Sequence, residues 1–288
     1  MNKKSSGLWA IVVKLGSKFL AILAKGTKFW LATTSFAAYS YLYGWKFAVA
    51  IMAMLFFHES GHVWAMRKCG IPTKGFYFIP LLGGAAVPDR AFKSRGEEFY
   101  VAIMGPIWGW LFSLAIMLIY YATGNPLFAV ISSWMALINL FNLLPVSPLD
   151  GGRMLKSILF SINSKLAIFA MYCGVLLCAL FIFYFKIFFF ALLLVLSGIE
   201  LYFENRRNKR LIENKALMMS ANAELTKEMV ETEEIIQAEQ IEHMPKMKKS
   251  HVIIAIIGSI LIATVLFIVM YVMKDVPGAD AAHKMLRN

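Results

Sequence analysis

The sequence has few charged residues and few cysteines, and both shortages limit what the protein can be. Asp, Glu, Lys and Arg make up 16% of the 288 residues, against about 25% in soluble domains. Apolar residues reach 59%, which is more than a water-soluble globule of this size can readily bury. The only cysteines are Cys69, Cys173 and Cys178, too few for a disulfide-stapled secreted module. The composition also excludes disorder and collagen, and it indicates a protein whose solvent is the lipid bilayer.

Long apolar stretches predict six or seven transmembrane helices, and therefore an all-α polytopic membrane protein. A helix needs about 20 apolar residues to cross a bilayer. Whether the number of spans is six or seven depends on Trp30–Gly44, which is short and contains several hydroxyl side chains. The stretches are Trp30–Gly44, Phe47–Met66, Phe99–Ala122, Leu127–Val146, Leu166–Phe185, Ile187–Phe203 and Val252–Met273.

The net charge of +12 is explained by where the basic residues lie in the predicted membrane topology, and it does not indicate binding to nucleic acid. If the N-terminus is cytoplasmic, segments 1–29, 67–98, 147–165 and 204–251 lie inside and hold 6, 6, 3 and 9 of the 29 Lys and Arg. This bias obeys the positive-inside rule. We therefore expect a multi-pass protein of a bacterial cell membrane that makes no direct contact with nucleic acid.

The chain divides into five predicted segments. Residues 1–29 have lysines spaced between apolar runs, which is typical of an amphipathic helix on a membrane surface or of a disordered basic arm. Residues 30–203 form the main transmembrane domain, 251–273 a final span and 274–288 a short tail. Residues 204–250 contain no Gly, which favours a cytoplasmic helical segment. This segment is either a solvated connection between two spans or a docking surface for a cytoplasmic regulatory partner.

The motif His58-Glu59-Ser60-Gly61-His62 lies in the cytoplasmic half of the second predicted span. On an α-helix, residues four apart share a face, so both imidazoles can reach one metal ion, and Glu59 can take a proton from a metal-bound water. Two His and a Glu are costly inside an apolar span unless they face a partner or water. The alternative is that the three side chains only hydrogen-bond one another between helices.

A catalytic zinc needs three protein ligands and one open position, and Asp150 is the candidate third ligand. It follows the fourth predicted span, where Pro145 and Pro148 interrupt the helix and Gly151 relaxes the backbone. Asp150 could instead be the N-cap of a helix that starts at Gly151. Other acidic or imidazole side chains near the same membrane face are His251, Glu97, Glu98 and Glu204.

Together these motifs resemble the site-2 protease (M50) family of intramembrane metalloproteases. The resemblance covers approximately residues 47–156. Its elements, in order, are HESGH at 58–62, Leu81-Leu82-Gly83-Gly84, Glu98 ahead of Gly105-Pro106, and the block with Asn142, Pro145, Leu149, Asp150 and Gly151. Neither a PDZ domain nor a CBS domain, which many relatives carry, has room here.

The resemblance implies a three-helix metalloprotease core, additional transmembrane helices and a re-entrant hairpin loop. It implies one zinc ion (Zn2+) per chain, held by His58, His62 and Asp150, with Glu59 as general base. By the same resemblance Asn142 orients substrate or stabilises the oxyanion, although a buried Asn could simply bond a neighbouring helix. Residues 76–87 would be the hairpin, whose edge receives an unwound substrate strand, rather than a surface loop.

The expected function is therefore that of a zinc metalloendopeptidase that cleaves a peptide bond in or near a transmembrane segment of a membrane-protein substrate. Its site would face the cytoplasm. One alternative is a different membrane zincin whose third ligand is Glu200 or Glu204. Another is a catalytically inactive membrane scaffold that uses the helical segment 204–250.

Overall fold

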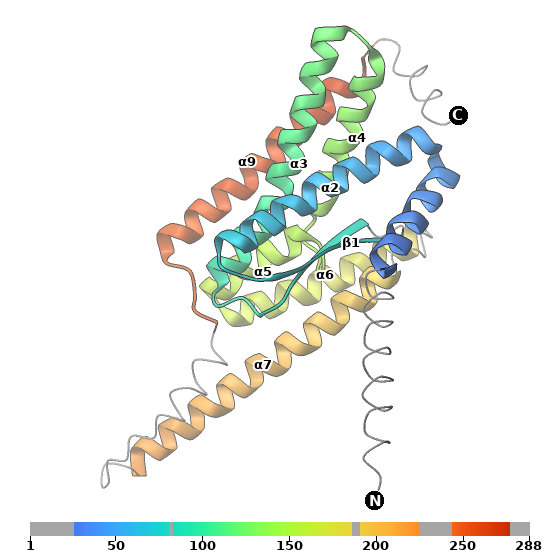
Figure 1. Ribbon diagram of the computed structural model, residues 1–288. Coiled ribbons are helices and arrows are strands. Elements are labelled where there is room, and N and C mark those ends of the chain that lie inside the picture. The colour runs from blue at the N-terminus through green and yellow to red at the C-terminus, as the bar shows by residue number, and fades with distance from the viewer. Residues whose placement is uncertain (1–25, 81–82, 186–190, 225–243, 277–288) are drawn as a thin grey trace, which may run out of the picture.

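The computed structural model describes residues 26–80, 83–185, 191–224 and 244–276. Helices dominate, and a single two-stranded antiparallel sheet lies beside them in the described part of the chain (Figure 1). A first helix covers residues 26–43. The elements that follow are α2 (Trp45–Lys68), β1 (Thr73–Ile79), β2 (Gly83–Pro88), α3 (Arg95–Thr123), α4 (Pro126–Asn142), α5 (Asp150–Ile162), α6 (Ser164–Phe185), α7 (Ala191–Glu224) and α9 (Lys249–Lys274).

Helix α3 is the centre of the bundle, because it packs against α2, α4, α5 and α9. Helices α3 and α4 run antiparallel and are joined by a tight turn at Gly124, which takes a left-handed conformation with φ of 64°. A glycine is suited to this position because it has no Cβ to clash. Apolar side chains from α2 and α4 form one core cluster, and those from α4 and α9 form another.

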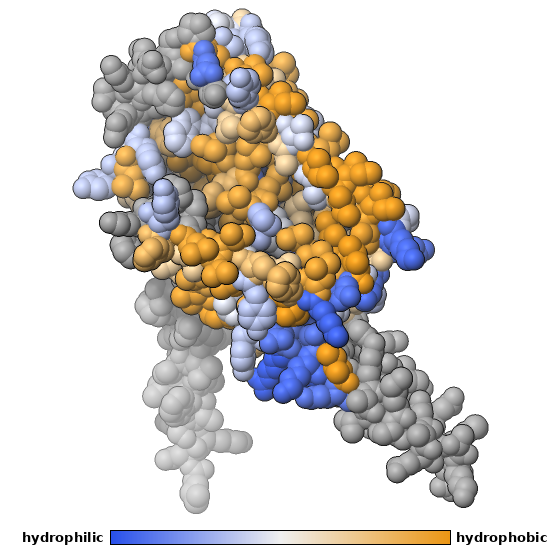
Figure 2. Space-filling view, turned by 180° about the vertical axis from the view of Figure 1, so that it is seen from behind, coloured by the Kyte–Doolittle hydropathy of each residue, from blue (hydrophilic) through white to orange (hydrophobic). Residues whose placement is uncertain are grey.

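In the part of the chain that the structure describes, four helices are long and apolar enough to cross a membrane: α2, α3, Ser164–Tyr184 within α6, and Lys249–Met273 within α9. Helix α4 is apolar but has only 17 residues. Large apolar side chains are exposed over much of the bundle, and Figure 2 shows them covering one face above a hydrophilic patch. Such a surface suits lipid and not water, so the prediction of a helical multi-pass membrane protein is confirmed.

Several predicted boundaries differ from the observed ones. Helix α4 ends at Asn142 and not at Val146, because the Pro145 ring disfavours helix in the residues before it. The predicted span 187–203 begins in residues outside the described part, and from Ala191 onward α7 continues without a break to Glu224. The predicted boundary at 204 therefore falls inside one helix. Residues 1–25, 225–243 and 277–288 of the other predicted segments lie outside the described residues.

The predicted hairpin is confirmed. Strands β1 and β2 pair antiparallel, with Phe76 opposite Ala86 and Ile79 opposite Gly83. Both strands pack against α2, the helix that carries the HESGH motif. Apolar runs with β-branched and aromatic residues favour strand in β1, and the small residues of β2 let it approach α2 closely.

Candidate metal centre

Helix α2 presents His58 and His62 on one buried face. The two side chains are four residues apart, and their Nε2 atoms lie 3.2 Å from each other. His58 is 2% exposed and His62 is 4% exposed. The i, i+4 spacing thus produces the convergence that the sequence predicted.

Asp150 completes this group as the first residue of α5. Its Oδ2 atom lies 2.9 Å from His58 Nε2 and 3.2 Å from His62 Nε2. The N-cap of α5 is Leu149 and makes no side-chain capping bond. Asp150 is therefore not the N-cap, and its carboxylate is directed at the imidazoles.

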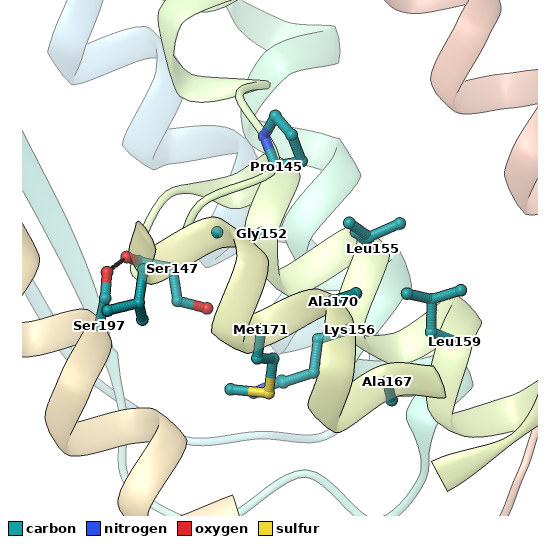
Figure 3. A pocket seen from close by; sticks show the side chains of 12 residues that line it. Pro145, Ser147, Gly152, Leu155, Lys156, Leu159, Ala167, Ala170, Met171 and Ser197 are labelled. Atoms are coloured by element: carbon teal, nitrogen blue, oxygen red, sulfur yellow. Dashed lines mark hydrogen bonds between the residues drawn. The ribbon is translucent and has the colours of Figure 1, made fainter. Parts of the chain in front are cut away.

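The turn between α4 and α5 places Asp150 because two glycines let the backbone pack tightly. A Cβ on Gly151 or Gly152 would collide with the backbone of Leu143 or Val146. Helix α7 also holds this turn, since the Ser197 hydroxyl donates to the Ser147 carbonyl (Figure 3). The neighbouring cavity between α5, α6 and α7 is about 20 Å³, which is room for about one water.

The three donor atoms fit a tetrahedral metal ion. Among the residues that the structure describes, His58, His62 and Asp150 form the one group whose ligand atoms lie within 4.8 Å of one another. Bonds of about 2.0–2.1 Å to a tetrahedral zinc place two ligand atoms about 3.3 Å apart. The observed separations of 2.9–3.2 Å are close to this edge length.

The outer nitrogens of both imidazoles have acceptors. His58 Nδ1 lies 2.8 Å from Asn139 Oδ1, and His62 Nδ1 lies 2.7 Å from the Val101 carbonyl oxygen. An acceptor at Nδ1 fixes the tautomer in which Nε2 carries a lone pair, as is usual for metal-binding histidines. Two lone pairs and a carboxylate oxygen then face one another, and this arrangement requires a cation or a shared proton between them.

Helix α3 leaves space for the two rings because it has no side chain at Gly105. A Cβ at this position would collide with His62 Nε2 and lie 2.8 Å from His58 Nε2. Gly61 on α2 is needed for the same steric reason, since a Cβ there would lie 2.9 Å from the Met104 carbonyl carbon. The close approach of α2 and α3 is thus built from glycines on both helices.

Glu59 is buried between α2 and the hairpin, with 5% of its surface exposed. A Cβ on Gly84 of β2 would lie 2.7 Å from Glu59 Oε1. The carboxylate has no hydrogen-bond partner among the described residues. Strand β2 therefore lies directly beside the Glu59 carboxylate.

Burial by itself would disfavour the charged form of Asp150. When their Nε2 atoms carry protons, the two imidazoles outweigh this cost by charge and hydrogen bonding, and they lower the pKa of the Asp150 carboxyl below its ordinary value. Asp150 is therefore an anion at neutral pH, which is the form that binds a metal ion.

The competing carboxylates lie in a second group, which we call the ion cluster: Arg95, Glu98, Lys156, Glu200 and Glu204. Glu98 accepts from Arg95 at 2.9 Å and from Lys156 at 2.7 Å. Glu204 also contacts Arg95, at 3.3 Å, and Glu200 pairs with Lys156. Burial would lower the pKa of Lys156, but the three carboxylates raise it above its ordinary value, so these acids are already neutralised by cations.

The remaining predicted ligands are also placed. Glu97 pairs with Arg90 at 2.9 Å outside the centre, and His251 is exposed near the start of α9. Asn142 is the last residue of α4 and is half-buried. Its side chain makes no hydrogen bond to another described residue.

Sequence reasoning missed Asn139, which is fully buried and contacts His58 directly. The available signal was a polar amide inside the apolar run of α4, one helical turn before Asn142. That signal does not say which of the two amides faces α2.

Known proteins share the segment that carries these residues. The sequence model of Peptidase family M50 matches residues 46–133 and 125–182. A protein named zinc metalloprotease from Methanocaldococcus jannaschii is 28% identical over 116 residues, which are 38% of this chain and 33% of that protein. Rip3 of Mycobacterium tuberculosis is 33% identical over 122 residues, which are 39% of this chain and 30% of that protein.

A solved structure is also similar. The site-2 protease from Methanocaldococcus jannaschii aligns with a TM-score of 0.44 and 22% identity, over 72% of this chain and 90% of the other. The chain spans only about a third of the length of the two curated relatives. The family match covers α2, the hairpin, α3, α4, α5 and most of α6, and it includes every side chain of the metal centre. Residues 46–182 of this chain are thus similar to peptidase family M50.

Proposed function

We propose that the protein is an intramembrane zinc metalloendopeptidase that hydrolyses a peptide bond in or near a transmembrane segment of a membrane-protein substrate. The observation that carries this proposal is the convergence of His58, His62 and Asp150 within 3.2 Å of one another, beside a buried Glu59. The names of the curated relatives agree with zinc chemistry.

His58, His62 and Asp150 would hold one zinc ion and leave a fourth position open. When bound, zinc polarises a carbonyl group and lowers the pKa of water toward about 7. The residues of this chain supply the rest of the chemistry. Asn139 and Val101 fix the imidazole tautomers through Nδ1.

Glu59 would be the general base and then the general acid. It accepts the proton of the attacking water and passes it to the leaving amine, so that its own charge is restored after each cycle. Its place beside Gly84, with no hydrogen-bond partner among the described residues, supports this role. Asn142 would orient the substrate or stabilise the oxyanion from the adjacent end of α4.

The hairpin would present the substrate in an extended form. Peptide bonds in a membrane helix are shielded by their own hydrogen bonds, so a substrate must unwind before attack. A strand added to the edge of the hairpin would recover those bonds. The short distance between β2 and Glu59 supports this position for the substrate backbone.

The site would face the cytoplasm. The backbone of Arg95 donates to the Pro245 carbonyl, and that of Met247 donates to Ser161. Residues from three of the four predicted inside segments thus meet at one end of the bundle. The proposal also includes two partners, the lipid bilayer and a cytoplasmic regulatory partner.

The two alternatives have less support. Glu200 and Glu204 are paired with Lys156 and Arg95, so neither is free to be a third ligand. A binding-only scaffold has no need for two imidazoles and a carboxylate that face one another beneath the bilayer surface.

The test compares membrane-peptide fragments from cells that carry the wild type, Glu59→Gln or Glu97→Gln. Glu59→Gln removes the base but no metal ligand, so we expect fragment formation to fall about 10²–10⁴-fold while the purified protein keeps its zinc. Glu97→Gln is the matched control, because it makes the same chemical change outside the centre. Unchanged fragments in Glu59→Gln cells would overturn the proposal.

A further inference from the structure

We propose that Asn139 is a positioning residue that holds His58 in the orientation and tautomer needed to bind the metal; this rests on the proposed function. Asn139 lies on α4, a helix that supplies no metal ligand of its own. It is fully buried, and its Oδ1 atom lies 2.8 Å from His58 Nδ1.

The orientation of the Asn139 amide is set by its other end. Its Nδ2 atom donates to the Met135 carbonyl oxygen at 2.8 Å. A flipped amide would place two oxygens against each other, so Oδ1 must face His58. His58 Nδ1 therefore carries the proton and donates it to Oδ1, which leaves the Nε2 lone pair directed at Asp150 and His62.

Helix α3 provides the space for this amide. A Cβ on Gly109 would collide with Asn139 Oδ1 and lie 2.6 Å from Nδ2. Gly109 is four residues after Gly105, so the two positions share one face of α3. The same glycine face thus accommodates the two imidazoles at Gly105 and the amide at Gly109.

The two histidines differ in what orients them. His62 Nδ1 bonds to a backbone carbonyl, that of Val101, which no substitution removes. His58 depends on a side chain from a different helix. The geometry of the metal centre is therefore coupled to the packing of α4 through one hydrogen bond.

A buried amide can also serve only to join two helices, and the same interface contains such a contact. Ser113 and Ser132 exchange reciprocal hydrogen bonds between α3 and α4, at 2.9 and 2.8 Å. Ser132 is as fully buried as Asn139 and lies two turns before it on α4. It contacts neither imidazole, which makes Ser132→Ala a matched control.

The experiment measures the zinc affinity of the full-length protein in detergent by competition with a chelator. We expect Asn139→Leu to weaken zinc binding about 10–100-fold, the range typical of lost outer contacts to metal-bound histidines. Asn139→Asp keeps an acceptor facing Nδ1 and, when its buried carboxyl is protonated, a donor facing the Met135 carbonyl, so its affinity should stay within about threefold of wild type. Ser132→Ala should leave the affinity unchanged.

A spectroscopic readout separates positioning from general loosening. Nitrogen NMR of histidine-labelled, metal-free protein, recorded at alkaline pH where the imidazole is neutral, should show His58 with its proton on Nδ1 in the wild type. In Asn139→Leu the population should move toward the Nε2–H tautomer, and Asn139→Asp should restore the original signal. The signal is assigned by its loss in His58→Ala.

Wild-type affinity and an unchanged His58 tautomer in a folded Asn139→Leu protein would overturn the inference. If that variant does not fold, Gly109→Ala carries the test, because it displaces the amide without changing a polar group; unchanged affinity then overturns the inference. Both readouts are independent of proteolysis. A wild type that binds zinc but cleaves nothing would refute the proposed function and leave the role of Asn139 intact.

Discussion

The bundle contains two buried polar groups built from similar residue types, and only one of them suits a metal ion. In the ion cluster, three carboxylates face Arg95 and Lys156, whose N–H groups satisfy them. In the metal centre, the single carboxylate of Asp150 faces the Nε2 atoms of two imidazoles whose Nδ1 atoms have acceptors on the far side of each ring. The difference teaches that the supply of protons, more than the number of acids, separates a structural ion pair from a metal site.

The largest expected effect separates the two groups by metal content. Asp150→Ala removes a donor atom from the centre, so the purified protein should lose the zinc that the wild type retains. Glu204→Gln removes a carboxylate of similar burial from the ion cluster and should keep about one zinc per chain. Elemental analysis after mild detergent extraction measures both. Zinc lost from Glu204→Gln but kept by Asp150→Ala would mean that the third ligand belongs to the ion cluster.

The second largest expected effect is a loss of folding stability when the ion cluster loses a cation. Lys156→Met leaves Glu98 and Glu200 without their shared cation, which should lower the free energy of unfolding by about 3–5 kcal/mol. The exposed Lys165 on α6 is the matched control, and Lys165→Met should change stability by less than about 0.5 kcal/mol. Denaturation in mixed detergent micelles measures the difference. Equal losses in both variants would contradict a special role for the buried cation.

A smaller effect tests the steric side of the metal centre. Gly105→Ala adds a methyl group against both imidazoles, and we expect it to weaken zinc binding and to cost about 1–3 kcal/mol of stability. Gly258→Ala on α9 is the control, because its Cβ would lie 3.7 Å from Ile103, an ordinary contact. The control should be neutral or slightly stabilising through higher helix propensity. Thermal unfolding with and without zinc distinguishes them, and a neutral Gly105→Ala would show that the rings can move aside.

The parts of the site that depend on local spacing could be predicted from the sequence. The separation of His58 and His62 by four residues is enough to bring them together once α2 is helical, and the turn after α4 marked Asp150 as a candidate. The hairpin was expected from the resemblance, and its strands are found at 73–79 and 83–88.

The parts of the site that depend on packing between helices could not be predicted from the sequence. Nothing in the run of α4 tells whether Asn139 or Asn142 faces α2, because the rotation of a helix is set by its neighbours. Glu98, Glu200 and Glu204 remained open as ligands for the same reason, since these acids and their basic partners are spread over three different helices. The continuous helix past residue 203 was missed because a change from apolar to charged residues is also how a span ends.

The length of α7 has a mechanical consequence. Beyond Glu204 the helix continues for 20 residues to Glu224, or about 30 Å, and in Figure 1 it extends past the rest of the bundle. The salt bridges of the ion cluster hold this helix near Glu204. If the helix is rigid, a tilt of about 5° at Glu204 moves its end at Glu224 by about 3 Å. Conversely, a force applied to the end of α7 at Glu224 acts with a long lever arm on the salt bridges of Glu200 and Glu204.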